Sequence, residues 1–226
     1  MQSAIAAFLP AFSPTDPNLQ PDAFQSYLNG AESANNEVAD AESTFTTATT
    51  DRRDAATAIQ DKALRVRDLV ASNVAWKKYL PAIDAAARLV RGTPVPAKAK
   101  AAPPAGAPAG PPKKARMGAR SQQGFADIAK NFGKLLAAVG KVAGYAAAEG
   151  SGLRVQDLTA QRTAFGTLNQ AATDAEADLG EKQRRRTDYF DGENGVKAKM
   201  KAIKLAARSQ YGSRSAQYAA VKGIGL

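Results

Sequence analysis

DAFQSYLNGAESANNEVADAESTFTTATTDRRDAATAIQDKALRVRDLVASNVAWKKYL, residues 22–80, contains no proline and a single glycine, Gly30. Apolar side chains recur in it at helical spacing, from Phe24 through Phe45 to Leu69. Such spacing places them on one face of an α-helix. The stretch predicts one very long helix, or two in line that meet at the threonine-rich TFTTATT, because β-branched residues lower helix propensity.

Further helices are expected along the rest of the chain. Pro81 is expected to end or bend the first element, and residues 84–90 to form a short helix. Residues 155–190 are predicted to form a second long helix, 191–195 (DGENG) a turn, and 196–209 a last helix. A helix is also predicted over 125–146, with an apolar seam at three- and four-residue spacing through Phe125, Ile128, Phe132, Leu135, Val139, Val142 and Ala146.

A basic stretch lies in the middle of the chain. PAKAKAAPPAGAPAGPPKKARMGAR, residues 96–120, has six Lys and Arg, no Asp or Glu, and few side chains that could pack. Residues 1–97 carry 9 basic and 11 acidic residues, and residues 121–226 carry 16 and 10. Ala/Pro/Gly composition favours an extended, solvated backbone. We therefore expect a first helical unit over 1–92, a linker over 93–124 and a second unit over 125–226.

An internal similarity supports two related units. NEVADAESTFTTATTDRRD, residues 36–54, aligns with QAATDAEADLGEKQRRRTD, residues 170–188, with five identities in nineteen positions. Chance similarity between alanine-rich helices is the alternative explanation. If the repeat is real, the basic stretch joins two related units.

The second half also resembles a group of uncharacterised bacterial helical proteins. The resemblance rests on FADIAKNFGKLLAAVGKVAGY, on RRRTDYFDGENGVKAKMKAIKLAARSQYG, and on a terminal S-x-Q-Y-x-x-V-x-x-I motif. The segments SPTDPNLQPDAF and NVAWKKYLPAIDAAARLVRG are similar to the front half of the same group. The resemblance implies a mostly helical, two-unit structure and no particular activity.

The composition removes several classes of chemistry. The 226 residues include no Cys and no His. Thiolate nucleophiles, disulfides, Cys/His zinc sites and an imidazole base are therefore excluded. We expect no catalytic site, cofactor or metal, and the carboxylate pairs Asp174/Asp178 and Asp51/Asp54 show no converging partner. With no apolar run of membrane-spanning length, the chain is expected to be soluble and cytoplasmic.

The last predicted helix carries the sharpest candidate site. A basic stripe runs beside an apolar stripe of Val196, Met200, Ile203 and Ala207, and residues 195–226 contain no acid. Such a stripe can hold a polyanion or another subunit. The alternative is a solvated surface helix whose lysines pair with acids of the long helices, such as Glu37, Asp40 or Asp61. Together with the linker, the candidate residues are Lys197, Lys201, Lys204, Arg208, Lys98, Lys100, Lys113, Lys114 and Arg116.

Two other basic features have ordinary explanations that we favour. KQRRR, residues 182–186, could clamp phosphate, but cations before a helix end also complement the helix dipole. The cationic amphipathic helix over 125–146 could lie on a membrane surface, but its seam would serve equally as the core of a bundle.

The sequence thus predicts an all-α protein of long antiparallel helices. The leading functional hypothesis is a non-enzymatic structural protein that self-assembles as a homo-oligomer into a sheet, tube or filament. The alternative is a binder of polyanions, either nucleic acid or an anionic membrane or granule surface.

Overall fold

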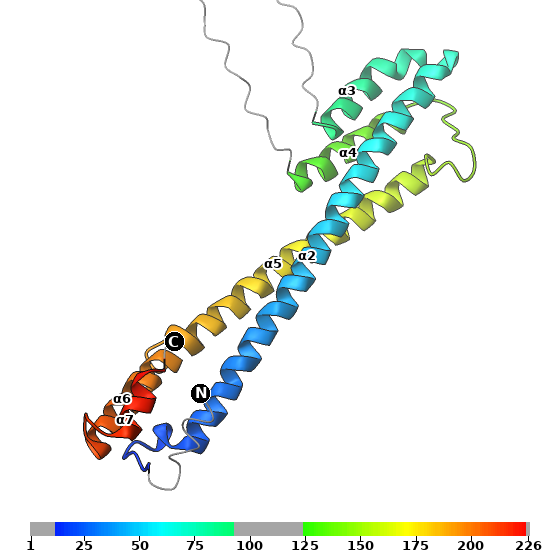
Figure 1. Ribbon diagram of the computed structural model, residues 1–226. Coiled ribbons are helices and arrows are strands. Elements are labelled where there is room, and N and C mark those ends of the chain that lie inside the picture. The colour runs from blue at the N-terminus through cyan, green and yellow to red at the C-terminus, as the bar shows by residue number, and fades with distance from the viewer. Residues whose placement is uncertain (1–11, 93–123, 225–226) are drawn as a thin grey trace, which may run out of the picture. The chain divides into compact units, whose positions relative to one another are not determined.

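The computed structural model describes residues 12–92 and 124–224, which form helices and connecting turns without a β-strand (Figure 1). The all-α prediction is confirmed. In chain order the elements are η1 (Pro17–Leu19), α2 (Pro21–Ser72), η2 (Val74–Tyr79), α3 (Leu80–Val90), α4 (Phe125–Val139), α5 (Val155–Asp191), α6 (Val196–Tyr211) and α7 (Ala216–Lys222).

Helix α2 is one continuous element of 52 residues and not two helices in line. Its threonine-rich part stays helical because the hydroxyls find acceptors one turn back: Thr44 Oγ1 donates to the Asp40 carbonyl at 2.9 Å and Thr46 Oγ1 to the Glu42 carbonyl at 2.8 Å. After α2, the Asn73 side chain accepts from the Ala75 amide and caps η2. Pro81 lies in the first turn of α3, where its missing N–H costs no helical hydrogen bond.

The described chain divides into two compact units, each built from both sides of the proline-rich segment. Unit 1 comprises residues 12–47 and 174–224, and unit 2 comprises residues 48–92 and 124–173. These boundaries differ from the predicted units 1–92 and 125–226. The physical reason is that the long helices α2 and α5 each contribute one half to unit 1 and the other half to unit 2.

Unit 2 has the larger core. The second half of α2, α3, α4 and the first half of α5 bury a common apolar cluster that includes Ile59, Val66, Ile83, Phe132 and Phe165. Helices α3 and α4 pack together, and the Asn131 amide of α4 donates to the Leu89 carbonyl of α3 at 3.2 Å. The seam predicted for 125–146 therefore serves as bundle core from Phe125 to Val142, as we favoured, whereas Ala146 is exposed.

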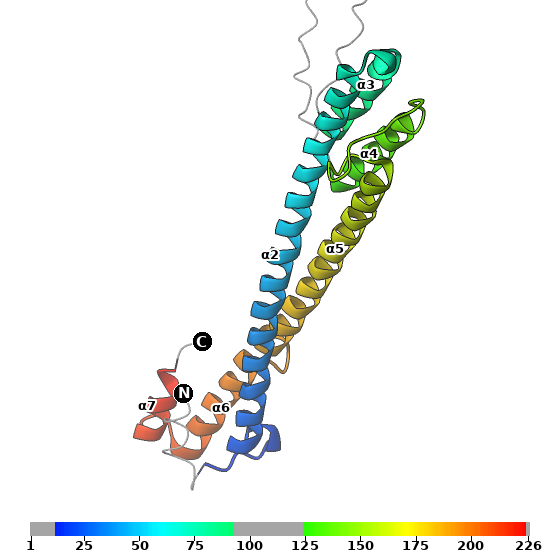
Figure 2. The same cartoon turned by 90° about the vertical axis from the view of Figure 1, so that its right-hand side faces the viewer.

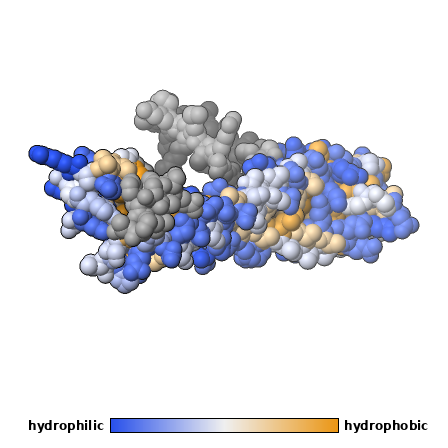
Figure 3. Space-filling model, turned by 60° about the horizontal axis from the view of Figure 1, so that its bottom comes forward, coloured by the Kyte–Doolittle hydropathy of each residue, from blue (hydrophilic) through white to orange (hydrophobic). Residues whose placement is uncertain are grey.

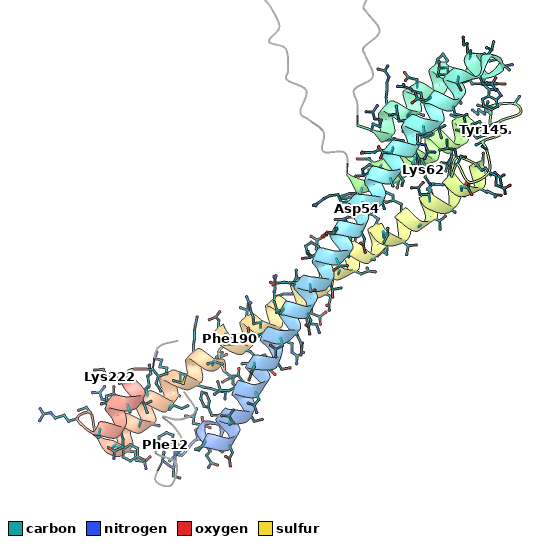
Figure 4. The ribbon with its side chains drawn as sticks, turned by 45° about the vertical axis from the view of Figure 1, so that its right-hand side comes forward. Phe12, Asp54, Lys62, Tyr145, Phe190 and Lys222 are labelled. Atoms are coloured by element: carbon teal, nitrogen blue, oxygen red, sulfur yellow. The ribbon has the colours of Figure 1, made fainter. Side chains whose placement is uncertain are left out.

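Helix α4 ends earlier than predicted, at Val139 instead of residue 146. Gly140 caps it, and Gly144 has a φ of +69°, a left-handed conformation that a helix excludes. The loop that follows is held by the unit 2 core: Trp76 Nε1 donates to the Ala143 carbonyl at 3.2 Å, and Tyr145 Oη donates to the Leu153 carbonyl at 3.0 Å. Figure 4 labels Tyr145 in this loop.

In unit 1 the start of α2 shares a core with α6 and α7. Helices α6 and α7 pack beside each other (Figure 2). Its core contains Leu19, Phe24 and Ala31 from the first segment and Val196, Met200, Ile203 and Val221 from the last. Phe190, from the last turn of α5, packs against it (Figure 4). Phe12 and Ile224, near the two ends of the described chain, also pack against this one core.

Large apolar side chains are mostly enclosed within the units. Among the described residues, the exposed ones are Val74, Leu89, Val155 and Leu205. In the view of Figure 3, hydrophilic residues cover most of the described surface and apolar residues appear as separate patches. Over the same residues, no helix has the length and apolar character needed to cross a membrane.

Candidate functional site

Charge is segregated along the segments that form unit 1. Residues 12–47, which we call the acidic segment, carry six Asp and Glu and no Lys or Arg. Residues 195–224, the basic segment, carry seven Lys and Arg and no Asp or Glu. The two segments share one core, so one compact unit carries both a purely acidic and a purely basic part of the chain.

The acidic segment shows its carboxylates on the outside of α2. Asp22, Glu32 and Asp40 are exposed, while Ala34 and Val38 are buried. Intervals of ten and eight residues keep the three carboxylates on the side of the helix away from the core, spread over about 27 Å at 1.5 Å per residue. Glu37 lies between the two sides and is already paired, with Lys182 at 3.4 Å and Arg185 at 2.8 Å.

Helix α6 presents the two stripes that its sequence predicts. The apolar stripe of Val196, Met200, Ile203 and Ala207 is buried in unit 1. Its burial fixes the rotation of the helix, because residues at this spacing face one way. The basic stripe consequently lies beside the core and not within it.

The four predicted residues of the basic stripe divide into two pairs. Lys197 forms an ion pair with Asp191 at the end of α5, and Lys204 Nζ donates to the Ile224 carbonyl at 2.7 Å. Lys201 and Arg208 are exposed and have no carboxylate partner among the described residues. Lys197 thus contacts the end of α5 and Lys204 contacts residue 224, whereas Lys201 and Arg208 remain exposed.

The remaining predicted residues lie outside the described part of the chain: Lys98, Lys100, Lys113, Lys114 and Arg116. Sequence reasoning also missed two exposed cations of the basic segment, Arg214 and Lys222. They flank and end helix α7, which was not predicted. The signal for it was Ser215, whose Oγ accepts from the Tyr218 amide at 3.0 Å as an N-cap.

The KQRRR cluster does not lie at the helix end, and two of its cations are paired. Helix α5 continues to Asp191 and has no basic residue in its last turn, so the helix-dipole explanation is wrong: the dipole acts only within that turn. Lys182 and Arg185 instead bind Glu37 of α2. The cluster therefore holds the two long helices together within unit 1, and the two segments aligned as a repeat meet at this contact.

A second feature of unit 1 joins residues that are far apart in the sequence. The side chains of Tyr27 from α2, Tyr189 from α5 and Lys199 from α6 line a cleft of about 290 Å³, together with Asn18, Ser26 and Gly30. We call it the tyrosine cleft. The ring centroids of Tyr27 and Tyr189 are 5.4 Å apart, and Lys199 Nζ lies 4.8 Å from the Tyr27 centroid.

Hydrogen bonding and close packing fix the tyrosine pair. Tyr27 Oη donates to the Tyr189 carbonyl at 3.0 Å. The Tyr189 ring lies so close to Gly30 that a Cβ there would be 3.2 Å from Cε1. Burial raises the pKa of Tyr27 above its usual 10.0, and neighbouring Tyr189 raises that pKa further, so Tyr27 is a neutral donor at physiological pH.

Among the described residues, no three Asp or Glu side chains gather as metal ligands would. The chain matches no protein-family model, no curated protein and no solved structure. The resemblance to uncharacterised bacterial helical proteins stays a prediction.

Proposed function

We propose that this protein is a non-enzymatic structural protein that self-assembles head to tail, the acidic segment of one copy facing the basic segment of the next. The observation that carries the proposal is the charge segregation in unit 1: six acids without a base in residues 12–47, and seven bases without an acid in residues 195–224. Two different, complementary patches make a heterologous contact, which produces rings or open filaments.

The contact offers several ion pairs and little apolar burial. Asp22, Glu32 and Asp40 can face cations such as Lys201 and Arg208, and the one exposed large apolar side chain of α6 is Leu205. Exposed ion pairs contribute roughly 0.2–1 kcal/mol each, so a few of them give on the order of 1–4 kcal/mol. Each contact is therefore weak, and assembly should depend strongly on protein concentration and salt.

The test is a reciprocal charge reversal followed by light scattering and sedimentation in about 0.02 M salt, where screening extends over roughly 20 Å. Variant A carries Lys201→Glu and Arg208→Glu, and variant B carries Glu32→Lys and Asp40→Lys. Each variant alone repels its own copies and should remain a monomer. An equimolar mixture restores opposite charges across the contact and should assemble.

The matched control reverses Lys77 and Lys130, two exposed lysines of unit 2, to Glu. This variant has the same net charge as variant A and should assemble like the wild type. Assembly of variant A by itself, or a wild type that stays monomeric at high concentration and low salt, would refute the proposal.

The second candidate function is binding of polyanions. It is favoured by the cations of the basic segment that lack a carboxylate partner among the described residues, and by the six bases without an acid in residues 98–120. Adding duplex DNA to the wild type decides between self-assembly and polyanion binding. If particles form only with DNA, the cations bind the polyanion and not another copy of the protein. The binding constant should then fall by about 0.9 log units per log unit of salt for each phosphate contacted.

A further inference from the structure

We propose that the tyrosine cleft binds one nucleotide of a single-stranded nucleic acid, with the base against the tyrosine rings and a phosphate on Lys199. The inference does not rest on self-assembly, although Tyr27 lies in the acidic segment and Lys199 in the basic segment, because one copy alone provides all the residues that line the cleft. It would give the protein a ligand of defined chemistry.

The dimensions of the cleft fit a small ligand. Its volume of about 290 Å³ lies just below the roughly 300–1,000 Å³ usual for small-molecule sites. The cleft is open to solvent and is lined by residues from η1, the start of α2, the end of α5 and α6. One ring system with its sugar and phosphate fits such a space better than a large buried cofactor.

The rings make the cleft suitable for a planar group. Tyr27 and Tyr189 are both half-buried, and their planes are inclined at 52°. Gly30 allows the Tyr189 ring to lie against α2, and the hydrogen bond from Tyr27 Oη to the Tyr189 carbonyl holds the Tyr27 ring in place. Fixed aromatic rings beside a groove are the usual stacking platform for bases of single strands.

The charge makes the cleft suitable for an anion. The lining residues include no Asp or Glu, and Lys199 has no carboxylate partner among the described residues. The nearest other cation to the rings, Arg185, lies 6.0 Å from the Tyr189 centroid and is paired with Glu37. Lys199 is thus an unneutralised ammonium over the Tyr27 ring, and the polar side chains of Asn18 and Ser26 also line the cleft.

The test compares two labelled single strands of equal length by fluorescence anisotropy at about 0.15 M salt. One is oligo(dT) and the other is the same backbone without bases, so the two share phosphates and differ only in stacking. A stacked base is worth roughly 1–3 kcal/mol, so we expect the wild type to prefer oligo(dT) about 10-fold.

Variants assign this preference to the cleft. Tyr189→Leu should abolish the preference for bases while Tyr189→Phe keeps it, because the acceptor for Tyr27 is the main-chain carbonyl. Lys199→Gln should weaken both strands and Lys199→Arg should restore them. Lys201→Gln and Tyr218→Leu, which change the basic segment outside the cleft, are the controls and should leave the oligo(dT) preference unchanged.

Equal binding of the two strands by the wild type would overturn the inference and indicate a polyanion surface alone. So would a base preference that survives Tyr189→Leu. If the leucine variant is unfolded by circular dichroism, the lysine variants decide: unchanged oligo(dT) binding in Lys199→Gln contradicts the proposal. Binding of free thymidine phosphate as tightly as oligo(dT) would restrict the ligand to a mononucleotide and overturn the single-strand assignment.

Discussion

Two tyrosines keep their protons more tightly in the folded protein than in the unfolded chain. Burial raises the pKa of Tyr145 above 10.0, and burial together with Tyr189 raises the pKa of Tyr27. A group whose folded-state pKa is raised stabilises the fold below its unfolded pKa, and that stability is lost as the pH rises through the folded-state pKa. The titration of these two tyrosines therefore changes the free energy of unfolding only above neutral pH.

Urea unfolding between about pH 8 and pH 11 should show a free energy of unfolding that declines once the pH passes about 10. In Tyr145→Phe the decline should be smaller, because one of the two groups is gone. The same variant should lose about 1 kcal/mol at pH 8, since the hydrogen bond from Tyr145 Oη to the Leu153 carbonyl is lost. A decline of unchanged size in Tyr145→Phe would show that this tyrosine does not titrate in the folded state as argued.

Helices α2 and α5 each contain a glycine inside unit 1, in different surroundings. Gly180 of α5 has open space around its Cα, whereas a Cβ on Gly30 of α2 would meet the Tyr189 ring at 3.2 Å. Alanine is favoured over glycine in a helix by up to about 1 kcal/mol. The difference in stability between the two alanine variants thus measures the cost of moving the Tyr189 ring.

Gly180→Ala should raise the free energy of unfolding by roughly 0.5–1 kcal/mol, measured by urea denaturation. Gly30→Ala should gain less or become destabilising, because the Tyr189 ring has to shift by a few tenths of an ångström. Equal stabilisation by both alanines would mean that the ring moves freely, and that the tyrosine cleft is less rigid than its contacts indicate.

The sequence predicts those helices well whose apolar residues follow a local, regular spacing. The periodicity of apolar residues gives α2, α5 and the buried stripe of α6, because a helix needs only its own spacing to define a face. The short α7 and the early end of α4 escape that argument. The end of α4 depends on Gly140 and on Trp76, which lies 67 residues from its acceptor Ala143.

The tyrosine cleft could not be predicted from pattern at all. Tyr27 and Tyr189 are 162 residues apart, and no local rule pairs them. The basic stripe of α6 shows the same limit, because spacing alone does not distinguish its four cations. In the structure, Lys197 is paired with Asp191 and Lys204 donates to the Ile224 carbonyl, whereas Lys201 and Arg208 are exposed. Which charges remain available depends on the tertiary structure.

At the scale of the whole chain, each compact unit needs residues from both sides of the proline-rich segment. In unit 2, Ile83 and Val90 of α3 share a core with Ile128 and Phe132 of α4. In unit 1, Phe24 of α2 shares a core with Met200 of α6. Burying such side chains contributes about 1.5–3 kcal/mol each, and that contribution does not require an intact linker.

A protease site placed between residues 93 and 123 tests this organisation. After cleavage, the two fragments should elute together at the size of the uncut 23.6 kDa chain and keep its helical circular dichroism. Residues 1–92 expressed alone should be largely unfolded, since the fragment lacks half of each core. Two separate fragments that both remain folded would support instead the units 1–92 and 125–226.

The positions of the chain ends allow the same fold to be connected in another order. Phe12 and Ile224 pack against one core, and residues 92 and 124 both belong to unit 2, where α3 and α4 pack together. A circular permutant that begins at residue 124 and ends at residue 92, with the native ends joined, would retain the described helices and both cores. During synthesis of the permutant, α4 to α7 would leave the ribosome before α2. The same architecture would then form although its helices are made in a different order.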